Sequence, residues 1–184
     1  MGAGGDAEIH GGSTPLGIIA SGEVGTLKLT TTGADITDSG ALVVLGATTI
    51  DAGGADVTLN HGSSNLQGAV GVLGRNILMT HPTGIDLGAS TVTGTYGVTA
   101  TAGDITDSGV LAITGTSTFT VANGQSVILD ESSTFATVTF ASAGTIASIE
   151  VNDSNALDLG TLTTTGNLTV TAGGNITDSG IVTV

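Results

Sequence analysis

The sequence contains no cysteine and no tryptophan, and it has only one tyrosine and three phenylalanines. The absence of cysteine excludes disulfide bonds, thiolate chemistry and cysteine-based zinc sites. Because aromatic rings are so few, small aliphatic side chains must fill the core. The apolar residues are mostly Val, Ile and Leu in short segments. We therefore expect a fold that buries many short pieces of chain.

Basic residues are almost as scarce, since Lys28 and Arg75 face sixteen acids and the net charge is −14. Two bases cannot neutralise a run of phosphates, so we expect no nucleic-acid partner. No run of 18 apolar residues occurs, so we expect no membrane insertion. The first residues also lack the basic and apolar parts of a signal peptide. A charged fraction of 10% with 39% hydrophobic residues argues against a disordered chain.

The most informative feature of the sequence is an internal repeat. The pentapeptide Ile-Thr-Asp-Ser-Gly at positions 36–40 recurs unchanged at 105–109 and at 176–180, which is a period of about 70 residues. Similarity extends on both sides of each copy. Repeats therefore cover about 26–94, 95–166 and 167–184, the last one incomplete. Self-similarity at a fixed period is typical of solenoids and other repeat architectures.

Each repeat contains about nine short segments in which apolar residues alternate with threonine, as in residues 168–171. Alternation with period two predicts strands with one buried face. Nine strands divide into three coils of three, each of about 23 residues. We therefore predict an all-β parallel β-helix (β-solenoid) of about eight coils. The alternative all-β fold, an antiparallel sandwich or barrel, does not explain the repeat.

Residues 168–184, and also residues 11–19, resemble the repeats of filamentous-haemagglutinin-type bacterial surface proteins. This resemblance implies a right-handed parallel β-helix at the extracellular bacterial cell surface, with a stalk or adhesin role. It also implies a host-cell or other cell-surface receptor as partner. The secretion-recognition domain usual in that family is not visible. We expect residues 1–184 to form a single β-solenoid, either as a slice of a longer repeat array or as a subunit stacked end to end on copies of itself.

Acidic and amide side chains around the three pentapeptides are candidate calcium ligands, because Ca²⁺ binds carboxylate and carbonyl oxygens. They are Asp35, Asp38, Asp104, Asp107, Asn175 and Asp178. We favour a structural role instead, in which these side chains cap turns. In those same turns Gly40, Gly109 and Gly180 are expected to adopt positive φ. We thus expect no cofactor, with Ca²⁺ the only ion considered.

Nothing in the sequence favours an enzyme. The carboxylates are scattered among turns, and Lys28 and Arg75 are far apart, so neither a hydrolase pair nor a lyase site is indicated. We expect Lys28 to point outward between inward-facing Leu27 and Leu29. The three histidines, His10, His61 and His81, lack metal-ligand spacing and are expected at the surface or in turns.

Pairs of threonines separated by one residue recur, for example Thr116/Thr118 and Thr137/Thr139. Stacked on one flat face they would resemble an ice-binding solenoid, although strand propensity alone explains them. Tyr96 is the only aromatic residue expected on a strand exterior, so a carbohydrate platform is not indicated. The sequence thus predicts a non-enzymatic, extracellular structural or adhesive segment of a surface adhesin. The alternatives are a head-to-tail filament subunit and an ice-binding solenoid.

Overall fold

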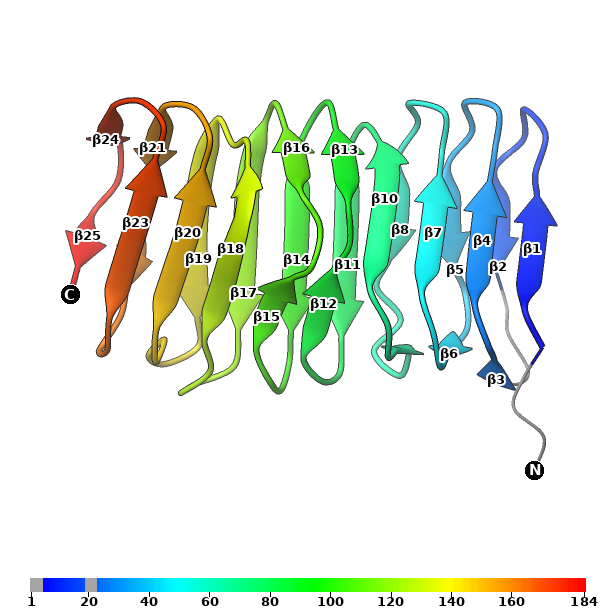
Figure 1. The fold of residues 1–184 in the computed structure, drawn as a ribbon. Helices are drawn as coiled ribbons and strands as arrows, with labels where there is room; N and C mark the ends of the chain where they lie inside the picture. Colours follow the sequence, from blue (N-terminus) through cyan, green and yellow to red (C-terminus); the bar gives the residue numbers. More distant parts are fainter. Residues whose placement is uncertain (1–4, 19–22) are drawn as a thin grey trace.

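The computed structural model describes residues 5–18 and 23–184. These residues form a parallel β-solenoid of about nine turns (Figure 1). The predicted fold class is therefore confirmed. The described residues contain no helix, and hence none long and apolar enough to cross a membrane.

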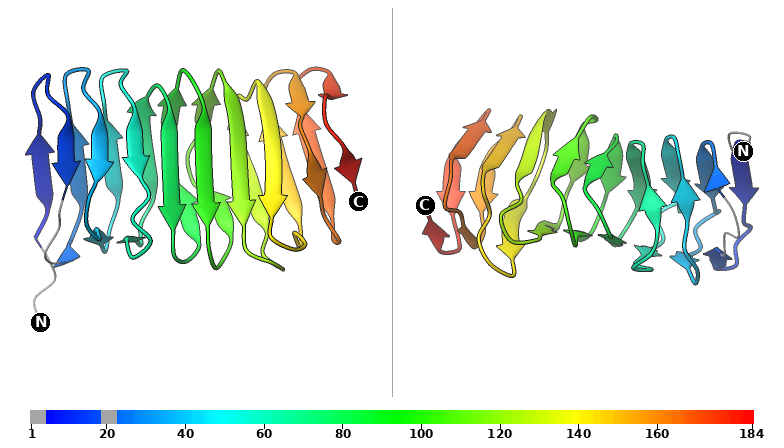
Figure 2. Two further views of the ribbon diagram at one scale, coloured as in Figure 1. Left: turned by 180° about the vertical axis from the view of Figure 1, so that it is seen from behind. Right: turned by 90° about the horizontal axis from the view of Figure 1, so that it is seen from below.

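Two large parallel sheets, here called face A and face B, form the flattened sides of the solenoid (Figures 1 and 2). In spatial order face A contains β1 (Ala7–His10), β4 (Leu27–Thr30), β7 (Thr48–Asp51), β10 (Val70–Gly74), β12 (Ile85–Leu87), β15 (Ile105–Asp107), β18 (Val127–Ser133), β20 (Ile149–Asp153) and β23 (Leu168–Ala172). Face B contains β2 (Leu16–Ile18), β5 (Ile36–Asp38), β8 (Val57–Leu59), β11 (Ile77–His81), β14 (Tyr96–Ala100), β17 (Thr116–Val121), β19 (Thr137–Ser142), β21 (Leu157–Leu159) and β24 (Ile176–Asp178).

Short strands form two small separate sheets on the path from face B to face A. One contains β3 (Glu23–Val24), β6 (Val43–Val44) and β9 (Asn65–Leu66), and the other contains β22 (Leu162–Thr163) and β25 (Val182–Thr183). In the middle of the molecule, β13 (Ser90–Val92) and β16 (Leu111–Ile113) instead belong to the sheet of face A, where they follow β12 and β15 (Figure 1). There β13 pairs with both β10 and β16.

The turns are shorter than the sequence predicted. Leu27 pairs with Thr48 and Thr48 with Val70, so one turn takes about 22 residues there. Ile77 pairs with Tyr96, which makes a shorter turn of about 19 residues. Turns of about 20 residues instead of about 23 explain why the chain makes about nine turns where about eight were expected.

The sequence repeat does not contain a whole number of turns. The three pentapeptide copies begin on β5, β15 and β24, which are the second strand of face B, the sixth of face A and the ninth of face B. Each repeat therefore advances the chain by about three and a half turns, and successive copies lie on opposite faces. The repeat thus contains about three and a half turns where three coils were expected. Among the described residues, most turns contain three short strands, as predicted.

The core is one continuous column of inward-facing side chains. Strands such as β4 and β8 alternate buried and more exposed residues, with Leu27 and Leu29 inside and Lys28 outside as predicted. The prediction that Tyr96 lies on a strand exterior was wrong. Tyr96 is fully buried because the alternation along β14 places Gly97 and Thr99 outside.

The few aromatic residues collect in the middle of this column. The ring of Phe119 meets those of Tyr96, Phe135 and Phe140 at centroid distances of 6.0, 6.2 and 6.0 Å. Edge-to-face and stacked pairs at such distances stabilise a core beyond the area that they bury. Most of the remaining core is Val, Ile and Leu, as the composition predicted.

Candidate functional site

Two of the candidate calcium ligands that precede strands, Asp35 and Asp104, each accept a hydrogen bond from the next turn. The backbone N–H of Asp56 donates to Oδ1 of Asp35 at 3.0 Å, and the N–H of Ser126 donates to Oδ1 of Asp104 at 2.7 Å. Both donors lie about one turn further along the chain. Each carboxylate thus accepts a backbone N–H group at the start of the following turn. The bond links two successive turns and does not cap the turn to which the carboxylate itself belongs.

The aspartates inside the pentapeptides make a second kind of link. Asp38 accepts the N–H groups of Asn60 and His61, and Ser64 Oγ donates to its Oδ2 at 3.2 Å. In the second repeat Asp107 Oδ1 accepts the N–H of Asp130 at 2.9 Å. The Asp38 carboxylate thus satisfies donors just after β8 ends, and the Asp107 carboxylate satisfies one in the irregular part of β18 between Leu129 and Ser133.

Asp107 differs from Asp38 in one respect. Asp107 is 8% exposed, and its Oδ2 is buried without a hydrogen-bond partner. Ser133 stands at the position of Ser64, and each serine Oγ accepts the N–H of the equivalent leucine, but only Ser64 also donates to its aspartate. Burial, together with the neighbouring carboxylates of Asp130 and Glu131, raises the pKa of Asp107 to about 7, against the opposing effect of the two backbone N–H bonds.

Asn175 and Asp178 lie at β24 in the last described turn, and both are exposed. Across the described residues, no three His, Cys, Asp or Glu side chains come together in a group able to hold a metal ion. The six predicted ligands therefore do not converge. Calcium binding stays an untested hypothesis, whereas the capping role of four of the six is visible in their hydrogen bonds.

Gly40, Gly109 and Gly180 lie in the predicted turns, but none of these three described residues has positive φ, so that prediction was wrong. Packing between turns is the constraint at the last two. A Cβ on Gly109 would lie 2.2 Å from the backbone N of Ala89, and one on Gly180 would lie 2.3 Å from that of Thr161. Side chains at these two positions would collide with the neighbouring turn.

The three histidines also differ in part from expectation. His10 is exposed beside Glu8, with 3.2 Å between Nε2 and Oε1, and His61 is half-buried in a turn. His81 was expected at the surface or in a turn, yet it is 2% exposed. Its Nε2 accepts the N–H of Leu66 at 2.8 Å, and burial lowers its pKa. The neutral imidazole of His81 thus accepts a backbone N–H of β9 from inside the solenoid.

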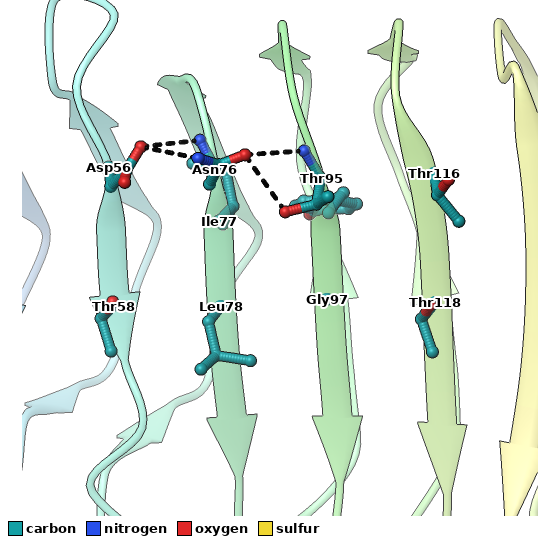
Figure 3. A pocket seen from close by; sticks show the side chains of 10 residues that line it. Asp56, Thr58, Asn76, Ile77, Leu78, Thr95, Gly97, Thr116 and Thr118 are labelled. Atoms are coloured by element: carbon teal, nitrogen blue, oxygen red, sulfur yellow. Dashed lines mark hydrogen bonds between the residues drawn. The ribbon is translucent and has the colours of Figure 1, made fainter.

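A network that the sequence did not reveal runs along the start of the strands of face B. Arg75 forms a two-bonded ion pair with Asp56, at 2.8 Å from Nε and 3.0 Å from Nη2. Asn76 donates to Asp56 and accepts the N–H of Thr95 at 3.1 Å (Figure 3). The ion pair lowers the pKa of Asp56. In the sequence, the members of this network are separated by the length of one turn. That spacing identifies them only when the turn length is already known.

Beside this network, an open trough of about 350 Å³ crosses the middle of face B. Its floor is Gly97, which has no side chain, between Leu78 and Thr118 of the neighbouring strands (Figure 3). Leu78 is 46% exposed. The trough contains no nucleophile paired with a base, and its carboxylate, Asp56, already binds Arg75 and Asn76.

Threonines surround the trough in rows that follow the register of the sheet. Thr118 lies beside Thr139, and Thr116 lies beside Thr137. Thr99 lies between Thr80 and Thr120. No outward-facing residue of β8, β11, β14, β17 or β19 is charged. Face A, by contrast, has acids pointing outward at Glu8, Asp51, Asp86 and Glu150.

Comparisons with known proteins agree with the repeat. Residues 4–73, 74–142 and 144–184 match three successive copies of a family described as repeats of unknown function (DUF5649). Searches of curated proteins and of solved structures gave no match. The first two matched copies are close in length to the spacing between successive pentapeptides. Because these matches cover almost the whole sequence, the chain belongs to this family of repeats.

Proposed function

We propose that this chain is a non-enzymatic structural segment, the rigid stalk of a bacterial surface adhesin. The observation that carries the proposal is the continuity of the links between turns. Parallel strand pairing, one unbroken core and the Asp and Asn caps join successive turns along the described chain. An unbroken column of this kind resists bending, which suits a spacer that holds a binding tip away from a cell.

The extracellular location is part of the same proposal and rests on the resemblance of residues 168–184 to filamentous-haemagglutinin-type repeats. The test is to label intact cells of the source bacterium with antibodies raised against this segment. Surface labelling that protease treatment of intact cells removes is the expected result. Labelling only after the cells are permeabilised would overturn the proposal.

The alternative proposal is a filament subunit that stacks end to end on copies of itself. Electron microscopy of the purified chain separates the two roles. The stalk segment is expected as single short rods, with nine turns at about 4.8 Å per turn giving about 43 Å. Uniform fibres many times longer, built only from this chain, would favour the filament.

Ice binding is a further candidate, favoured by the stacking of Thr116 over Thr137 and of Thr118 over Thr139 on one face. It predicts thermal hysteresis in dilute solution, and replacing Thr118 by a bulky charged residue should abolish it. A solution that freezes with no hysteresis would dismiss this candidate.

A further inference from the structure

We infer that residues 130–132 of face A form a pH-sensitive segment, which the carboxyl of Asp107 holds closed when it is protonated and releases when it ionises. These residues form a bulge in β18. Between Leu129 and Ser133, β18 contains two more residues than the part of β20 with which it pairs. All three bulge residues are exposed and none of them is apolar. The bulge can therefore move outward without exposing an apolar side chain of its own.

Two side chains hold this bulge against the solenoid. Asp107 Oδ1, on β15, accepts the N–H groups of Asp130 and Glu131 at 2.9 and 3.4 Å. On the other side, Asn152 Nδ2 on β20 donates to the carbonyl oxygen of Asp130 at 3.1 Å. Of these two side chains only Asp107 is titratable, because the asparagine amide has no proton to gain or lose near neutral pH. The link through Asp107 is therefore the one that a change of pH can break.

The burial of Asp107 distinguishes it from the exposed acids of the bulge. The residue is 8% exposed, and its Oδ2 is buried without a hydrogen-bond partner. An ionised oxygen in that position lacks both water and a donor, whereas a protonated carboxyl places no charge there. The closed segment is thus suited to the protonated form of Asp107.

The titratable groups around Asp107 supply no positive charge that offsets its ionisation. Among the described residues they are Asp130 and Glu131 on β18, Asp86 on the neighbouring strand β12, and Tyr96 on β14 across the core. Burial, together with Asp107 itself, raises the pKa of Tyr96, so its hydroxyl stays uncharged. The two bases of the chain bind acids elsewhere, at Glu8 and Asp56.

The first repeat has the same link without the neighbouring acids. Asp38 accepts the N–H groups of Asn60 and His61, which stand where the second repeat has Asp130 and Glu131. The Oδ2 of Asp38 also accepts a bond from a serine hydroxyl. The two repeats therefore differ in the groups that oppose ionisation of the aspartate, and only the second repeat has the features of a switch.

The balance of these contacts determines when the segment opens. The two N–H bonds favour the ionised carboxylate, but burial and the charges of Asp130 and Glu131 outweigh them and raise the pKa of Asp107 from 3.8 to about 7. In the open form, water reaches the carboxyl and it ionises near its ordinary pKa. Between these two values, the open form therefore gains about tenfold in population per pH unit, and the gain levels off above about pH 7.

The test is amide hydrogen exchange of the full chain by NMR at pH 5, 6 and 7, expressed as protection relative to the intrinsic exchange rate at each pH. Protection of the Asp130 N–H is expected to fall about tenfold from pH 5 to pH 6 and to fall further toward pH 7. The Ser126 N–H, which donates to the exposed carboxylate of Asp104, should keep its protection. The Val127 N–H, which donates to the carbonyl of Ser148, reports global unfolding and should stay better protected than Asp130 at every pH.

Two substitutions assign the effect to one carboxyl. Asp107→Asn keeps an oxygen that accepts N–H groups but cannot ionise, so protection of the bulge should stay constant from pH 5 to pH 7. Asp104→Asn is the matched control and should leave the fall in protection intact. Circular dichroism checks that both variants are folded. Protection of the bulge that is constant in the wild type, that falls equally in Asp107→Asn, or that equals the protection of Val127 at each pH would overturn the inference. None of these outcomes bears on the stalk proposal, which is tested on intact cells.

Discussion

The buried carboxyl of Asp107 should make the solenoid less stable as the pH rises toward neutrality. Its pKa is raised from 3.8 to about 7 in the folded chain, because the carboxyl is buried and its Oδ2 has no partner. Between these two values the folded chain holds a proton that the unfolded chain has released. Stability from this proton is therefore complete below about pH 4 and is lost as the pH rises through about 7.

The magnitude follows from the same shift. One pKa unit corresponds to 1.36 kcal/mol, so a shift of about three units gives up to about 4 kcal/mol. Between pH 5 and pH 8 the wild type should lose about 3 kcal/mol of this contribution. Asp107→Asn places an uncharged group of the same shape at this position and imitates the protonated acid. The variant should lack the loss and be more stable than the wild type at pH 8.

Urea unfolding followed by circular dichroism at pH 5, 6, 7 and 8 measures this difference. Comparing the variant with the wild type at each pH cancels the contributions of other groups, including His81, whose lowered pKa acts in the opposite direction. The reasoning is refuted if the stability difference between the two proteins stays constant from pH 5 to pH 8.

The equivalent residue of the first repeat supplies the control. Asp38 has Ser64 Oγ as a donor to Oδ2, which Asp107 lacks. Asp38→Asn replaces an acceptor by an amide that cannot receive this bond, so it should destabilise the fold by about 1–3 kcal/mol. The same substitution is thus expected to change stability in opposite directions at equivalent positions of two repeats. A gain of stability at pH 8 in both variants would contradict the role assigned to the unpartnered oxygen.

Three further outcomes are expected. Gly109→Ala should destabilise the fold by more than about 3 kcal/mol in urea unfolding, because its Cβ would lie 2.2 Å from the backbone N of Ala89. Gly97→Ala, on the open face, should instead stabilise the fold by up to about 1 kcal/mol. Equal effects of the two substitutions would show that contact between turns is not the constraint. His81→Ala should cost about 2–4 kcal/mol at pH 7, since it leaves a cavity and a buried Leu66 N–H without an acceptor; a cost within experimental error would refute this. Millimolar CaCl₂ should raise the melting temperature no more than MgCl₂ at equal ionic strength, and a calcium-specific rise of several degrees would contradict the capping role of the aspartates.

The sequence was sufficient to predict the fold class because the relevant signals are local. Alternation as in Leu27, Lys28 and Leu29 fixes which side chains face the core, and this prediction was confirmed. The repeat period predicted a solenoid, and the family match agrees with that period. The handedness and the extracellular role came from a resemblance and remain predictions.

The side-chain roles could be predicted less well, because they depend on which residues lie one turn apart. The link from Asp35 to Asp56 and the ion pair between Asp56 and Arg75 each join residues about one turn apart. With the longer turns that the sequence suggested, these partners fall out of register. His81 and Tyr96 were misplaced for a related reason. Which side of a short strand is buried depends on where that strand begins.

The half-turn offset between repeats determines how this chain can present a binding surface. Because one repeat makes about three and a half turns, a repeated feature appears on alternate faces. Asp86 with Ser108 on face A and Asp158 with Ser179 on face B are such a pair, linked at 2.8 and 2.6 Å. A given feature returns to the same face only after seven turns, or about 34 Å. A continuous surface of one character on one face therefore cannot arise from repetition alone. It requires the repeats to diverge, as they do where Gly97 and its surrounding threonines lie on face B, while the related strand β23 has Thr169 in place of that glycine.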